Sequence, residues 1–195
     1  TQPKVWQYAL SMRDKQQVAN ALKLSDAKPV LHTSGMFGNE NYCLSAVLPL
    51  CPHPSNKNQV LCFDLRHDPE EFINLSVAEI RERVFTSQKD LGDKPRIALK
   101  GVHINKCPML APIAMLSDDV AKRANLDKAK LREHYDKLLA NKAVWLKAAE
   151  VFENAYSDSK PVDNVEASLY SGGFLNNSDK QLLNDCLLYT SPSPR

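Results

Sequence analysis

The segment KGVHINKCP, residues 100–108, places two lysines, a histidine and an asparagine among residues typical of a β-strand. The loop CPHPSNKN, residues 51–58, adds Lys57 between Asn56 and Asn58. Lysine and asparagine on strands and tight turns suit phosphate groups, which position a nucleic acid strand without reading its bases. The pattern predicts a phosphate-binding surface, although lysines on a barrel surface often serve only solubility.

A zinc site is a second candidate. Cys51 and His53 are separated by one residue, and Cys62 and His67 follow them. Structural zinc sites usually contain close pairs, such as two cysteines separated by two residues, and this sequence has no such pair. Cys51 and Cys62 also continue apolar runs, which favours buried free thiols over metal ligands.

A cysteine nucleophile would require Cys107 and His103 to share one strand face. The following Pro108 favours a strand end at this point, and no local motif of a cysteine-dependent enzyme accompanies the pair. The alternative is therefore weaker than phosphate binding.

A metal-dependent nuclease requires several carboxylates that converge on metal ions. The acidic residues closest in sequence follow a strand-like run and precede a helix, so an exposed helix-capping turn is the favoured interpretation. They are Asp64, Asp68, Glu70 and Glu71. The sequence also lacks a Walker-type loop, GxSxG and HExxH, so it assigns no catalytic residue and no metal ligand.

The bulk composition is that of a globular protein with a core: 195 residues, 43% apolar and 25% charged. The net charge of +2 is too small to identify a nucleic-acid-binding protein by itself. Neither a membrane span nor a signal peptide is predicted. The five cysteines form no disulfide framework, which favours a reducing, cytoplasmic compartment.

Four short apolar segments predict β-strands: one within residues 29–38, then residues 43–50, 59–65 and 97–104. Helical spacing precedes them and resumes after Pro112, with a long helical segment between Leu131 and Phe152. Ser76 and Glu79 form a capping box for an inserted helix. The fold class predicted is α+β, a small β-barrel with helical insertions rather than a βαβ alternation.

The polar segment YSDSKPVDN, residues 156–164, predicts a linker and a domain boundary. We therefore expect one domain over residues 1–156 and the beginning of another over residues 157–185. Residues 186–195 have neither helical nor strand periodicity and are expected to be a non-native tail.

Several segments, in order, resemble the bacterial exodeoxyribonuclease I family. They are KPVLHTSGMFG (28–38), LPLCPHPSNKN (48–58), IRERVFT (80–86), KDLGD (89–93), VHINKCPMLA (102–111) and DNVEASLYSGGF (163–174). The likeness extends from about residue 3 to residue 185. It implies an SH3-like barrel with helical insertions over residues 1–156, where residues 1–2 end an exonuclease domain, followed by the start of a C-terminal α-helical domain.

The resemblance also implies a function for the parent protein. Members of this family degrade single-stranded DNA from its 3′ end to nucleoside 5′-monophosphates, with Mg²⁺, in DNA repair and recombination. The family's metal-binding acids would precede Thr1, so this segment is expected to be inactive alone and to form part of the DNA channel.

The DNA-binding residues expected from the sequence and the resemblance lie on strands, turns and one helix start. They are Lys15, His32, Asn58, Lys100, His103, Ile104, Asn105 and Lys106. The lysines and asparagines would contact phosphates, and Ile104 would pack against a sugar or a base. For His32 and His103, a buried, hydrogen-bonded structural role is at least as strong an alternative.

A second implied partner is the acidic, apolar C-terminal tail of single-stranded DNA-binding protein. Basic side chains around an apolar pocket would hold it, with Tyr8 and the helices over residues 117–139 as walls. The competing hypothesis is therefore a protein-interaction module that does not touch DNA. A monomer in the bacterial cytoplasm, without membrane attachment, is expected in either case.

Overall fold

The computed structural model describes residues 3–153, 178, 180–182 and 184–185. Two compact units divide the chain, Thr1–Tyr156 and Ser157–Arg195. In the second unit, the described residues are helical and exposed. The assignment of that unit to a C-terminal helical domain stays a prediction, as does the non-native tail, and the predicted linker lies outside the described residues.

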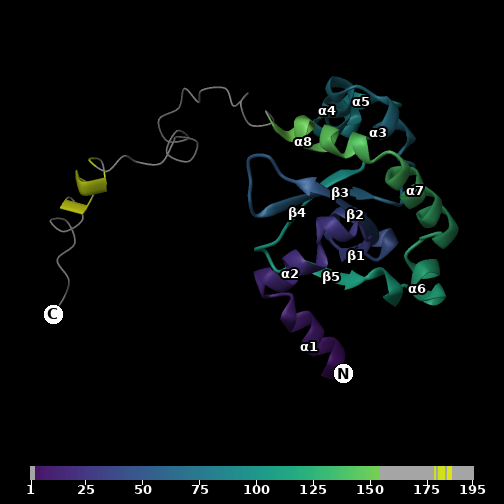
Figure 1. The fold of residues 1–195 in the computed structure, drawn as a ribbon, viewed down its shortest axis with the longest axis horizontal. Helices are drawn as coiled ribbons and strands as arrows, with labels where there is room; N and C mark the ends of the chain where they lie inside the picture. The colour runs from purple at the N-terminus through teal and green to yellow at the C-terminus, as the bar shows by residue number, and fades with distance from the viewer. Residues whose placement is uncertain (1–2, 154–177, 179, 183, 186–195) are drawn as a thin grey trace. The chain divides into compact units, whose positions relative to one another are not determined.

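The first unit contains a five-stranded antiparallel sheet with the strand order β4-β3-β2-β1-β5. Its strands are β1 Val30–Thr33, β2 Leu44–Pro52, β3 Gln59–Asp64, β4 Leu99–His103 and β5 Met109–Pro112. In Figure 1 the strands lie in the middle of this unit, with helices on both sides.

The helices fall into an N-terminal pair, a group inserted between β3 and β4, and a group after β5. They are α1 Pro3–Ser11, α2 Lys15–Ala21, α3 Glu70–Asn74, α4 Val77–Phe85, α5 Gln88–Leu91, α6 Asp118–Arg123, α7 Lys128–Ala140 and α8 Trp145–Glu153. Short 3₁₀ turns complete the described part: η1 Leu24–Asp26, η2 Gly35–Phe37, η3 Asn39–Asn41, η4 Ile113–Met115 and η5 Lys142–Val144.

Each face of the sheet is covered by its own hydrophobic core. Alternate strand residues, among them Leu48, Leu61 and Phe63, pack with α3, α4, α7 and α8 in the first core. Residues of opposite parity, such as Val47 and Cys62, pack with Met12, Val18 and Leu22 from the α1–α2 region in the second core. This alternation follows from the two-residue period of a β-strand.

A β-bulge interrupts the pairing of β2 with β3 between Pro49 and Cys51. An extra residue shifts the alternation of side chains, so the adjacent residues Leu50 and Cys51 both belong to the first core. The bulge lies just before the loop that joins the two strands.

The predicted α+β class is confirmed, and so is the capping box of Ser76 and Glu79, which begins α4. The four predicted strands are present as β1 to β4, and the prediction missed β5. Pro108 and Pro112 gave that segment the appearance of a loop, yet Pro112 can end an edge strand, where no donor is needed. The long predicted helix between Leu131 and Phe152 is divided by η5 into α7 and α8.

Within the described residues, the helices are too short or too polar for any of them to cross a lipid bilayer.

Phe63 offers a direct test of the first core. Its side chain is fully buried and stacks on Phe72, with ring centroids 5.5 Å apart. We expect Phe63→Ala to lower the free energy of unfolding by about 3–5 kcal/mol, because it leaves a cavity between sheet and helix. Chemical denaturation would measure this loss.

The exposed Met36, 79% accessible, is the control. Met36→Ala should change stability by about 0.5 kcal/mol at most. Equal effects of the two substitutions would contradict the assignment of Phe63 to the core.

Candidate nucleic-acid interface

Three segments that are distant in sequence meet where β3 begins and β4 ends. Lys15, at the start of α2, donates from Nζ to Oδ1 of Asn58 at 2.7 Å. The carbonyl of Asn58 accepts the backbone N–H of Ile104 at 2.9 Å. Asn105 and Lys106 follow in the same turn and are exposed. We call these five residues, Lys15, Asn58, Ile104, Asn105 and Lys106, the rim patch.

The loop between β2 and β3 fixes Asn58 by hydrogen bonds. Nδ1 of His53 accepts the backbone N–H groups of Ser55 and Asn56, both at 3.2 Å. Oδ1 of Asn56 then accepts the N–H of Asn58 at 3.0 Å. The loop is therefore ordered by side-chain acceptors, which replace the missing strand partners.

The turn between β4 and β5 presents the remaining members of the rim patch. Ile104 is half-buried and packs against the second core, so only part of its side chain remains for a ligand. Lys106 is exposed and can reach an anion. Cys107 has a φ of 46°, a left-handed conformation that turns the chain toward β5.

Lys100 and His32 lie elsewhere, on the sheet face that carries the second core. Nζ of Lys100 is buried 3.9 Å from the centroid of the Phe37 ring, a cation–π contact. His32 meets the same ring edge-on, with centroids 5.6 Å apart. Neither Lys100 Nζ nor His32 Nδ1 has a hydrogen-bond partner among the described residues.

The electrostatics of this pair differ from those of an exposed basic patch. Burial, reinforced by the charge of Lys100, lowers the pKa of His32 to about 4, so its ring is neutral at physiological pH. Burial also lowers the pKa of Lys100, and the nearby Asp64 carboxylate opposes that shift. Asp64 itself accepts hydrogen bonds from the Ser45 hydroxyl and the Arg66 N–H.

His103 is separated from Lys100 by the sheet. The two residues have opposite parity on β4, and Val102 beside His103 packs in the second core. Burial, followed by the charge of Lys106, lowers the pKa of His103. The structure thus brings Lys15, Asn58 and the β4–β5 turn together, and it separates them from the pair formed by His32 and Lys100.

The cysteines and acidic residues considered above as metal ligands or catalytic groups do not form such a site in the described structure. Cys51 and Cys62 are buried strand thiols, and burial raises the pKa of both. Strand β4 ends at His103, so Cys107 does not continue it. Within residues 3–153 and the short described helical pieces, no three histidine, cysteine, aspartate or glutamate side chains form a group that could hold a metal ion.

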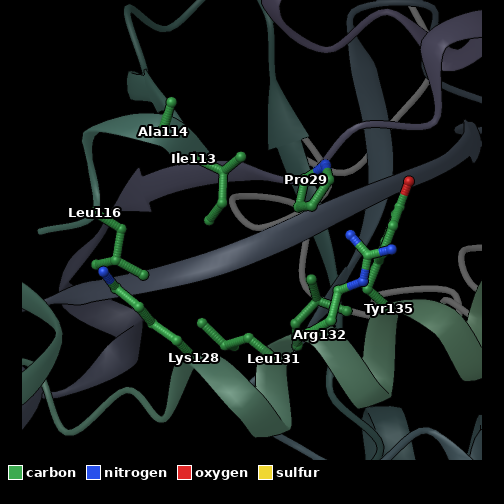
Figure 2. Close-up of a pocket in the computed structure, with 9 residues that line it drawn as sticks. Pro29, Ile113, Ala114, Leu116, Lys128, Leu131, Arg132 and Tyr135 are labelled. Carbon is green, nitrogen blue, oxygen red and sulfur yellow. The ribbon is translucent and has the colours of Figure 1, made fainter. Parts of the chain in front are cut away.

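A pocket of about 490 Å³ lies between α7 and the segment around η4. Figure 2 shows Lys128, Leu131, Arg132 and Tyr135 rising from α7 toward apolar residues on the other side. The lining is Pro29, Leu65, Ile113, Ala114, Leu116, Lys128, Leu131, Arg132 and Tyr135. We call it the α7 pocket. It combines two cations with apolar walls.

Tyr8 lines a neighbouring pocket of about 310 Å³, together with Lys23 and Lys28. Burial raises the pKa of Tyr8. The two pockets share Pro29, Ile113 and Ala114, so they adjoin each other. Of the helical region expected to form a basic, apolar pocket, α7 lines the α7 pocket, and Tyr8 lines the adjoining one; the binding of a partner there stays a prediction.

Sequence reasoning missed three features of these sites. The spacing of His53 from Ser55 and Asn56 was available as a signal, because an acceptor side chain often binds the N–H groups two and three residues later. Lys128 and Arg132 were missed because they lie among many other charged residues of an exposed helix, and nothing in the sequence distinguishes them. The contact of Phe37 with Lys100 joins segments 63 residues apart in sequence, and no local pattern predicts it.

The family description "Exonuclease I SH3-like domain" matches residues 13–154. The chain is 35% identical to exodeoxyribonuclease I of Escherichia coli K12 over 191 residues, which is 98% of this chain and 40% of that protein. It is 34% identical to exodeoxyribonuclease I of Haemophilus influenzae over all of this chain and 41% of that protein. The chain thus spans about 40% of the length of these relatives.

Solved structures give the same relationship. The metal-free E. coli exonuclease I–single-stranded DNA complex superimposes with a TM-score of 0.84 at 34% identity, covering 98% of this chain and 41% of that one. The zinc-bound form of that complex gives 0.83 at 34% identity, with coverage of 98% and 40%. A structure described as SSB/exonuclease I with the inhibitor CFAM gives 0.80 at 29% identity, with coverage of 98% and 38%.

The matched residues include all five strands of the sheet and both faces that the helices cover, so the mixed α+β architecture described above is an SH3-like one. The chain belongs to the exodeoxyribonuclease I family and contains the SH3-like domain of that family.

Proposed function

We propose that this chain forms one wall of the channel through which a 3′→5′ exodeoxyribonuclease draws single-stranded DNA. The observation that carries the proposal is the convergence of Lys15, Asn58 and the β4–β5 turn at the rim patch. Support comes from the E. coli relative, which has been solved in complex with single-stranded DNA. The parent would release nucleoside 5′-monophosphates during DNA repair and recombination in the bacterial cytoplasm.

The rim patch suits a strand that must move past it. Lys15 and Lys106 provide exposed cations at the surface, and Asn58 provides an amide whose position the loop fixes. Such groups bind phosphates without selecting a base, so each nucleotide step restores the same contacts. Ile104 would add an apolar contact to a sugar or a base.

Lys100, His32 and His103 stay in the proposed interface with different roles. The ammonium of Lys100 is covered by Phe37, so in this conformation it contributes positive potential rather than a direct phosphate contact. The neutral ring of His32 supports Phe37 edge-on. His103 lies beside Lys106 at the end of β4 and would act through that exposed neighbour.

We assign the chemistry to the portion of the parent that this chain does not cover. The residues described here do not fit a catalytic metal centre, since no suitable ligand group forms among them. A divalent ion, which we propose to be Mg²⁺, would be held by acids in that other portion. This chain by itself is expected to bind DNA weakly, as a monomer, and not to cleave it.

A second function is favoured by the α7 pocket. Lys128 and Arg132 flank apolar walls from Leu131 and Ile113, which suits an acidic peptide that ends in apolar residues. One solved relative is described as SSB/exonuclease I. We propose that the C-terminal tail of single-stranded DNA-binding protein docks here, with Tyr8 and Lys28 of the adjoining pocket available to its upstream residues.

The rim patch can be tested by removing its two cations. We expect Lys15→Ala/Lys106→Ala to weaken oligo-dT binding by this chain. The slope of log Kobs against log salt should fall in magnitude by about 1.4, because each lysine that neutralises one phosphate of a single strand accounts for about 0.7. Fluorescence anisotropy over a salt series would measure both quantities.

The matched control is Lys122→Ala/Lys130→Ala, which removes the same charge from exposed positions on α6 and α7. It should leave the slope unchanged. If both double variants lowered affinity equally, net charge rather than the rim patch would account for binding.

The proposed role of the α7 pocket is tested with a peptide instead of DNA. The test peptide is synthetic and consists of several aspartates followed by apolar C-terminal residues. We expect Lys128→Glu/Arg132→Glu to lower the affinity of the chain for this peptide by about tenfold or more, because two attractive contacts become repulsive. Oligo-dT affinity should remain within about twofold. Peptide binding that survived the double substitution would exclude this pocket as the docking site.

A further inference from the structure

His53 is a buried histidine outside the set of residues assigned to DNA. It is 4% exposed and follows β2 directly. Its ring meets Phe152 of α8 edge-on, with centroids 5.3 Å apart. The first core therefore holds the ring in one orientation, with Nδ1 directed at the backbone of the following loop.

The histidine acts as an acceptor in that orientation. Nδ1 takes the N–H groups of Ser55 and Asn56 at 3.2 Å each, and the Ser55 hydroxyl lies 3.4 Å away. A nitrogen that accepts two N–H donors is unprotonated, so the ring proton is on Nε2. The same lone pair is then unavailable to a metal ion, and a role as a zinc ligand through Nδ1 is incompatible with this geometry.

A series of hydrogen bonds leads from His53 to the rim patch. The N–H of Asn56 binds His53, and the side chain of Asn56 binds the N–H of Asn58 at 3.0 Å. The side chain of Asn58 then accepts Nζ of Lys15 at 2.7 Å. The backbone N–H of His53 also donates to the carbonyl of Gln59 at 3.0 Å, which closes the base of the loop.

We propose that His53 is a positioning residue for DNA binding: its Nδ1 acceptor holds the 53–58 loop so that Asn58 and Lys15 face the strand together. This inference rests on the proposed function of the rim patch. His53 does not touch DNA, because its side chain is buried beneath the loop. It acts by fixing the backbone from which Asn58 projects.

Two substitutions separate the acceptor from the bulk of the ring. His53→Phe keeps an aromatic ring against Phe152 but removes the acceptor. His53→Asn loses the ring contact but keeps an oxygen near the position of Nδ1, and asparagine commonly accepts the N–H groups two and three residues later. A purely structural role in the core would favour Phe, whereas loop positioning favours Asn.

We expect His53→Phe to weaken oligo-dT binding by this chain about threefold to tenfold, the range for losing one or two hydrogen bonds. His53→Asn should bind within about twofold of the unmodified chain. Hydrogen exchange at the amides of Ser55 and Asn56 should accelerate in His53→Phe and return toward its original rate in His53→Asn.

His134→Phe is the matched control. His134 is also a buried histidine, 6% exposed, and its Nδ1 lies 2.8 Å from the carbonyl of Leu65, remote from the rim patch in the hydrogen-bond network. This substitution should lower the melting temperature and leave oligo-dT affinity unchanged.

Should His53→Phe fail to fold, Asn56→Ala tests the next hydrogen bond in the series, from the N–H of Asn58 to the Asn56 side chain. Asn56 is a half-buried loop residue, so its substitution leaves the core intact. It should weaken oligo-dT binding to a similar degree. Normal binding by folded His53→Phe or by Asn56→Ala overturns the inference, as does His53→Asn binding no better than His53→Phe. Failure of the unmodified chain to bind oligo-dT at low salt would instead overturn the proposed function.

Discussion

Burial of the sheet on both faces is the constraint on which the rest of this structure depends. Leu61 and Phe63 fill one face, and Cys62 and Val102 fill the other. A small sheet with two cores has little strand surface left for a ligand, so strand ends and loops are the positions that remain for one. The rim patch is such a place, because the β2–β3 loop, the β4–β5 turn and the start of α2 meet there.

The position of each cation, more than the net charge of +2, decides whether it can contact a phosphate. Lys15 and Lys106 are exposed and available to phosphates, whereas Lys100 is packed under Phe37 and near Asp64. The same residue type therefore has two uses in one domain. In the proposed interface, exposed lysines would bind a moving strand with contacts that are easily exchanged, whereas the half-buried Lys100, whose Nζ is covered, would add positive potential from within the scaffold.

Much of the fold could be predicted from the sequence, and the reasons can be named for particular elements. Short apolar runs predicted β2 and β3, and the Ser76–Glu79 capping box marked the start of α4 correctly. Strand β5 was missed because two prolines hid a four-residue edge strand. Non-local contacts were also out of reach: neither the burial of Lys100 nor the bond between Lys15 and Asn58, 43 residues apart, follows from local pattern. The ordered family motifs indicated the family, which local chemistry alone left open.

The most direct test of the central claim is an amide chemical-shift titration of the isotopically labelled chain with oligo-dT at low salt. The account predicts that the largest shifts cluster at Lys15, Asn58 and residues 104–106, while the amides of α7 change little. Shifts confined to α7 and η4, with none at the rim patch, would contradict it.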